Sequence, residues 1–120
     1  MAKILVVEDE IIVLDVLKQF LEKDEHRVFT ATTGNEMLRI LSEEDGGIDL
    51  VILDLTLPDM NGMALLPTLT SDYPSIKLVI CSGALPDELE FGDEPFVKAV
   101  LNKPFDLREF RSVIERTLGG

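Results

Sequence analysis

The chain has 120 residues, of which 46% are hydrophobic, and its 23 acidic residues against 11 lysines and arginines give a formal net charge of −12. This length and composition predict one domain over residues 1–120 with a core of its own, and they exclude a disordered chain. The negative charge argues against direct binding of nucleic acid, because that affinity comes mainly from lysines and arginines that neutralise phosphates.

No apolar run approaches the roughly 20 residues that span a bilayer, and the first run is followed by acids, so neither a membrane span nor a signal peptide is expected. The single cysteine, Cys81, lies inside an apolar run, which favours a buried thiol in a reducing compartment. The sequence therefore predicts a soluble, cytoplasmic protein without a membrane partner.

Short apolar runs alternate along the chain with segments of helical period, a pattern typical of repeated βα units. Five strands are expected, in chain order at Ile4–Val7, Arg27–Ala31, Leu50–Asp54, Lys77–Cys81 and Val97–Leu101. Continuous apolar runs indicate strands that are buried on both faces of a parallel sheet, and in such sheets ligands bind beyond the carboxyl ends of the strands.

Helices are expected between the strands. The first covers about Glu10–Glu22 and carries a stripe for the core at Ile11, Leu14, Leu17, Lys18 and Leu21. The second covers Asn35–Ser42, and a third follows Gly62 with Pro67 in its first two turns, where a missing amide proton is tolerated.

The last helix, over about Leu107–Leu118, has the clearest start signal. Asp106 and Glu109 form a capping-box pattern, and Phe105 and Phe110 are spaced as a hydrophobic staple around it.

The segment Leu85–Phe96, between the fourth and fifth strands, is interrupted by two prolines and a glycine and carries five acids. Such a segment predicts only one or two helical turns, starting near Pro86, and a more mobile surface than the other helices provide.

Polar side chains follow four of the predicted strands, and they should meet at one edge of the sheet: Glu8, Asp9, Asp54, Ser82 and Lys103. Two carboxylates about 4 Å apart repel by roughly 4 kcal/mol at an effective dielectric constant of about 20, so the acids need a cation. Mg²⁺ is typically held by one or two carboxylates, waters and a substrate phosphate oxygen. With an ammonium and a hydroxyl beside them, the acids predict a site for a metal ion and a phosphoryl group.

These motifs, in this order and spacing, resemble the receiver domain of response regulators in bacterial two-component signalling. The resemblance covers nearly the whole chain and rests on the stretches Lys3–Glu10, Asp54–Gly62, Ser82–Ala84 and Lys103–Phe105. It implies a flavodoxin-like α/β fold: a single doubly wound, five-stranded parallel sheet of order 2-1-3-4-5 with (βα)5 topology. In this chain the fourth helix of that pattern would be short or irregular. The resemblance also implies a cis peptide bond between Lys103 and Pro104, which proline commonly allows.

The resemblance further implies a phosphorelay function, in which Asp54 accepts a phosphoryl group from a phosphohistidine with Mg²⁺ as cofactor. The donor would be a sensor histidine kinase or a histidine phosphotransfer protein, and the domain would catalyse only its own phosphorylation and dephosphorylation. The implied roles are metal binding by Asp9, Asp54, the Thr56 backbone carbonyl and, through water, Glu8; a switch hydroxyl at Ser82; and a cation for the phosphoryl group at Lys103.

Alternatives remain at this stage. A haloacid-dehalogenase-like phosphatase needs a second aspartate two residues after its nucleophile, where this chain has Thr56, and no Gly-rich phosphate loop supports a nucleotide switch. The open alternative is a docking module with a receiver fold that works without phosphorylation, because Val100 replaces the family's switch aromatic. The broken segment before Val97 resembles the terminal receivers of hybrid histidine kinases, and a downstream partner or output domain would lie outside this chain.

Overall fold

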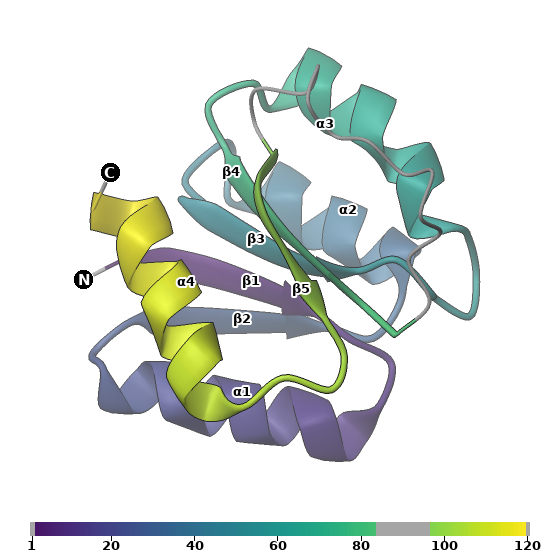
Figure 1. Cartoon of the computed structure of the whole chain (residues 1–120). Coiled ribbons are helices and arrows are strands. Elements are labelled where there is room, and N and C mark those ends of the chain that lie inside the picture. Colours follow the sequence, from purple (N-terminus) through teal and green to yellow (C-terminus); the bar gives the residue numbers. More distant parts are fainter. Residues whose placement is uncertain (1, 84–96, 120) are drawn as a thin grey trace.

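Five parallel strands form one sheet through the centre of the molecule, in the order β2-β1-β3-β4-β5 (Figure 1). The computed structural model describes residues 2–83 and 97–119. The strands are β1 Lys3–Val7, β2 Arg27–Ala31, β3 Leu50–Asp54, β4 Lys77–Ser82 and β5 Val97–Asn102. Each neighbouring pair is parallel, so the predicted fold class and strand order are confirmed.

Helices cover both faces of the sheet, α1 and α4 on one side and α2 and α3 on the other (Figure 1). Within the described ranges they are α1 Ile11–Lys23, α2 Gly34–Glu43, α3 Leu66–Asp72 and α4 Leu107–Gly119, with a 3₁₀ turn at Gly62–Leu65 before α3. None of these helices is long and apolar enough to cross a bilayer.

The sheet separates two hydrophobic cores because side chains alternate between the faces of a strand. In β3, Val51 and Leu53 join the core under α2 and α3, while Leu50 and Ile52 join the core under α1 and α4. Every residue of β3 is buried, including Asp54 at its end. The continuous apolar run therefore reflects burial on both faces, as predicted.

The start of α4 has the predicted form. The Asp106 carboxylate accepts a hydrogen bond from the Glu109 backbone N–H at 2.7 Å. The rings of Phe105 and Phe110 stack with their centroids 5.8 Å apart. Cap and staple together set the angle at which the chain leaves β5 and enters α4.

Three details differ from the sequence-based expectations or lie beyond them. Ile11 was expected on the buried stripe of the first helix, but it is 63% exposed because it occupies the first position of α1, at the rim of the sheet. Pro67 lies in the first turn of α3 because a 3₁₀ turn takes up the residues before it. The predicted irregular helix within Leu85–Phe96 falls on residues 84–96, outside the described residues.

We expect Phe110→Ala to lower the free energy of unfolding by about 3–5 kcal/mol, measured by urea denaturation. Phe110 is fully buried, and its ring contacts Phe20 and Phe105 at centroid distances of 5.9 and 5.8 Å. The control Ile12→Ala removes a side chain that is 82% exposed and should change stability by less than about 0.5 kcal/mol. Equal effects of the two substitutions would contradict the packing described here.

Candidate functional site

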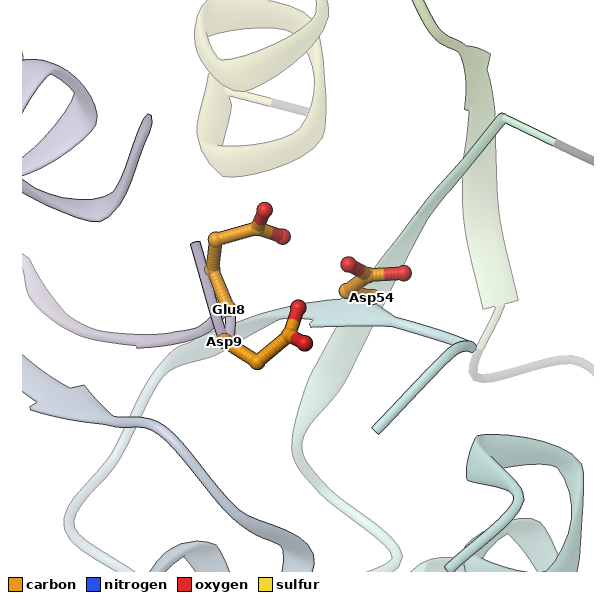
Figure 2. Close-up of side chains that lie close together, drawn as sticks. All are labelled: Glu8, Asp9 and Asp54. Carbon is orange, nitrogen blue, oxygen red and sulfur yellow. The ribbon is translucent and has the colours of Figure 1, made fainter. Parts of the chain in front are cut away.

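Three carboxylates meet where β1 and β3 end, and Figure 2 shows their side chains together at this edge of the sheet. Glu8 and Asp9 follow β1 directly, and the Glu8 backbone N–H donates to the Ala31 carbonyl at 3.0 Å, which continues the pairing with β2. Asp54 is the last residue of β3. Oxygen atoms of the three side chains lie within 4.8 Å of one another. The parallel register thus brings distant acids to one point.

Lys103 supplies a positive charge to this cluster from the end of β5. Its Nζ donates to both carboxylate oxygens of Glu8 at 2.9 Å and to Asp54 Oδ2 at 3.1 Å. Glu8 and Asp54 are only 2% and 5% exposed, so these ion pairs are largely shielded from water. The peptide bond from Lys103 to Pro104 is cis, as the family resemblance implied.

The loop after β3 holds the other oxygen of Asp54. The Thr56 backbone N–H donates to Asp54 Oδ1 at 2.9 Å. The loop closes where Thr56 and Asn61 form an isolated β-bridge and the Gly62 N–H donates to the Leu55 carbonyl at 2.8 Å. A Cβ on Gly62 would lie 2.7 Å from Leu55 Cα, so only glycine allows this close approach. Both Asp54 oxygens are therefore oriented by specific donors.

Burial sets the electrostatics of the cluster. It raises the pKa of Glu8 to about 7, with the neighbouring Asp54 adding to the rise and Lys103 opposing it. Burial by itself would lower the pKa of Lys103, but the hydrogen bonds to Glu8 and Asp54 outweigh it and raise that pKa. One ammonium does not neutralise three converging carboxylates. Glu8 is the group whose charged form is disfavoured.

The cluster could hold a hard divalent cation. All three side chains offer carboxylate oxygens, the ligands that Mg²⁺ and Ca²⁺ prefer, and Asp9 is exposed, so an ion has access from solvent. The raised pKa of Glu8, caused first by burial and then by Asp54, means that its charged form is disfavoured, which a cation beside the carboxylates would offset. The donor set and the charge deficit both fit such an ion.

Of the site residues predicted from the sequence, the structure describes the side chains of all but Ser82. It brings Glu8, Asp9, Asp54 and Lys103 together, and it sets the Thr56 amide against Asp54. The backbone of Ser82 ends β4 opposite Asn102, while its side chain lies outside the described part of the structure.

Cys81, which pairs in register with Asp54, is buried as predicted, and burial raises the pKa of its thiol to about 12. It is therefore a protonated packing residue.

Two features of the site were not found from the sequence. Asp59 bonds to the start of α2, a contact across the fold that a lone aspartate in a turn does not signal, since aspartate is common in turns. Large apolar side chains are exposed beside Lys103, at Ile12, Val16 and Leu107. Helical periodicity assigned Ile11 to the core because it cannot recognise that the first turn of α1 extends past the sheet.

Comparisons with known proteins agree with this geometry. A family model described as response regulator receiver domain matches residues 4–115. The aerobic respiration control protein ArcA of Escherichia coli is 36% identical, over 96% of this chain and 49% of its own length. The sensor kinase CckA of Brucella abortus is 32% identical, over 98% of this chain and 12% of its own length.

Among solved structures, the non-phosphorylated HemR receiver domain of Leptospira biflexa is 32% identical and superposes with a TM-score of 0.90, covering 100% of this chain and 96% of that one. The chain spans at most about half the length of the curated relatives named above. The match to the HemR domain covers nearly all of both chains.

We compare the free energy of unfolding of Glu8→Gln with that of the unsubstituted protein, in buffer with a metal chelator. As pH rises from about 5 to about 8, we expect this difference to change by up to about 3 kcal/mol in favour of the variant. With a pKa of about 7 instead of 4.5, the folded protein keeps a proton on Glu8 that the unfolded chain releases, so the stability contributed by Glu8 falls as pH rises through this window. Glutamine does not titrate, and urea denaturation at both pH values measures the difference.

The matched control for this experiment is Glu43→Gln, which changes an exposed carboxylate paired with Arg39. Its effect on stability should stay within about 0.5 kcal/mol at both pH values. A pH profile of Glu8→Gln parallel to that of the unsubstituted protein would contradict the raised pKa.

Proposed function

Since the chain belongs to the family of response regulator receiver domains, the signalling domains of two-component systems, we propose that Asp54 is its phosphoacceptor. It would take a phosphoryl group from a phosphohistidine of a sensor kinase or a histidine phosphotransfer protein, in a reaction that depends on Mg²⁺. The observation that carries this proposal is a buried carboxylate held by Lys103 on one oxygen and by the Thr56 amide on the other.

The two Asp54 oxygens then have different roles. We assign the attack on phosphorus to Oδ2, the oxygen beside Lys103 Nζ, whose positive charge would then face the incoming phosphoryl group, while the Thr56 N–H holds Oδ1. A bond forms between Oδ2 and phosphorus, the bond from phosphorus to the donor imidazole breaks, and its electron pair stays on the imidazole nitrogen. Lys103 Nζ, at 3.1 Å from Oδ2, provides a counter-charge for the transferred phosphoryl group.

Mg²⁺ would be held by Asp9, Asp54 and the Thr56 backbone carbonyl, with Glu8 acting through water. When bound, the ion neutralises charge that the phosphoryl oxygens and the carboxylates bring together. Attack of water on phosphorus later breaks the bond to Oδ2 and returns the Asp54 carboxylate with inorganic phosphate. The domain thus acts on its own phosphoryl group and on no other substrate.

Signalling would follow from the new charge on Asp54. The phosphoryl group attracts Ser82 and its loop and shifts an equilibrium at the β4–β5 side of the sheet, which a downstream partner or an output domain outside this chain reads. Val100 of β5, where the family has an aromatic, is 38% exposed. This aliphatic residue is what favours the second candidate, a docking module of receiver fold whose binding ignores phosphorylation.

The phosphodonor would dock on the apolar surface beside the site, defined here as Ile12 and Val16 of α1 with Leu107 of α4. A groove of about 580 Å³ lies along it, lined mainly by apolar side chains and reaching Lys103. The donor must bring its histidine against Asp54 Oδ2, so its surface necessarily covers the residues around Lys103. Exposed apolar side chains next to that point supply contact area.

The proposed chemistry predicts a two-step response to added ligands, followed by backbone amide NMR shifts. Mg²⁺ should move the signals of Glu8, Asp9 and Asp54, and beryllofluoride, a mimic of the aspartyl phosphoryl group, should then move those of Ser82 and Lys103. Acetyl phosphate should add one phosphoryl group, measured by intact mass.

Asp54→Asn is the control and should keep the fold but lose the response to beryllofluoride and the mass increase. Modification of Asp54→Asn to the same extent would show that Asp54 is not the acceptor. Partner binding that is unaffected by this substitution would favour the docking module instead.

We expect Ile12→Glu to reduce kcat/KM for phosphoryl transfer from a histidine kinase by about tenfold or more, the equivalent of 1.4 kcal/mol of lost docking energy. Ile12 is 82% exposed and belongs to neither buried core, so the fold should persist. Phosphorylation by acetyl phosphate needs no docking and should be unchanged. A similar exposed substitution on α2, Arg39→Glu, serves as the control, and equal effects of both would contradict docking on α1.

A further inference from the structure

The tip of the loop between β3 and α3 is bonded to the start of α2. Asp59 Oδ1 accepts a hydrogen bond from the Gly34 backbone N–H at 2.8 Å, and Oδ2 accepts one from the Asn35 N–H at 3.0 Å. These are the first two N–H groups of α2, which have no partner within the helix. The ionised carboxylate also suits the positive end of the helix dipole, and the two amides lower the pKa of Asp59.

The cap that α2 makes for itself satisfies a different group. Thr33 Oγ1 accepts from the Glu36 N–H at 3.0 Å, and the Glu36 carboxylate accepts from the N–H of Thr32, the residue before the cap, at 3.1 Å. The helix therefore has a local cap typical of many helices and, in addition, a second cap from a residue on the loop after β3. The second cap links two distant parts of the chain.

An apolar contact accompanies the bond. Met60 packs against the core beneath α2 and α3, and its side chain fills the space beside Gly34. A Cβ on Gly34 would lie 2.5 Å from Met60 Sδ, so the absence of a side chain at Gly34 makes room for the loop. The tip is therefore seated on α2 by a charged contact and by packing.

Only a few residues separate Asp59 at the loop tip from Asp54. The base of the loop is closed by the Thr56–Asn61 bridge, and the Thr56 N–H donates to Asp54 Oδ1. Asp59 lies between the two bridge residues. With the base bridged and the tip bonded to α2, the Thr56 peptide has little freedom to rotate, and its N–H remains directed at Asp54.

We propose that Asp59 is a positioning residue of the phosphoacceptor site. By holding the loop tip on α2, it keeps the Thr56 backbone in place, the N–H for Asp54 and the carbonyl for the metal ion. This inference rests on the proposed function of Asp54. Asp59 touches neither Asp54 nor the reacting atoms and acts through the Thr56 peptide. Residues that orient ligands of a metal typically change its affinity 10- to 100-fold when removed.

The test compares Asp59→Ala and Asp59→Asn with Thr33→Ala, which removes a cap from the same helix end without touching the loop. Asp59→Ala should raise the Mg²⁺ concentration that half-saturates the amide shift of Asp54 by about tenfold. Asp59→Asn should have a smaller effect, because its amide oxygen can still accept one N–H. Thr33→Ala should stay within about twofold of the unsubstituted protein, and hydrogen exchange of the Thr56 N–H should accelerate only in the Asp59 variants.

Equal changes in Asp59→Ala and Thr33→Ala, or no change in either, would overturn the proposal and leave Asp59 as a helix cap only. Its failure is distinguishable from failure of the proposed function. If the unsubstituted protein binds Mg²⁺ but acetyl phosphate does not modify it, the acceptor role of Asp54 fails, while the Mg²⁺ titration still decides the role of Asp59. If Mg²⁺ does not bind, exchange of the Thr56 N–H decides alone: faster exchange confined to the Asp59 variants supports positioning, and any other result overturns it.

Discussion

The contact between Lys103 and the two buried carboxylates is the constraint on which the site depends. Through its side chain, Lys103 at the end of β5 joins the residues that end β1 and β3. Buried charges are costly unless they are paired, and here one ammonium faces three converging carboxylates, two of them buried. A cation bound among these carboxylates would offset the repulsion between them.

The backbone makes this concentration of charge possible. Parallel strands place their last residues at one edge, and the two cores on either side of β1 and β3 fix those strands firmly enough to hold the acids together. The loop after β3 adds precision: glycine at position 62 allows its base to close, and the bond of Asp59 to α2 seats its tip. Stability is thus concentrated in the sheet, while the orientation of Asp54 comes from a short loop with contacts at both ends.

Sequence reasoning was most successful where one local pattern determines the outcome. The apolar run that ends in Asp54 is typical of a strand buried on both faces, and a parallel sheet then places the acids after β1 beside it. The cap and staple of α4 are likewise local. Contacts between segments distant in the sequence left no such trace: the bonds of Asp59 to Gly34 and Asn35 depend on how a loop folds over a helix. Ile11 satisfies the helical period yet is exposed, because periodicity does not say where the sheet ends.

Cys81 offers a way to observe motion beneath the site. It is the only thiol in the chain, it pairs in register with Asp54, and burial keeps it protonated and unreactive in the closed structure. A thiol reagent can therefore modify it only when the structure around the end of β4 opens. The rate of that labelling measures the frequency of local opening beside Asp54, on the protein without any substitution. The modification rate of Cys81 thus reports local opening of the sheet.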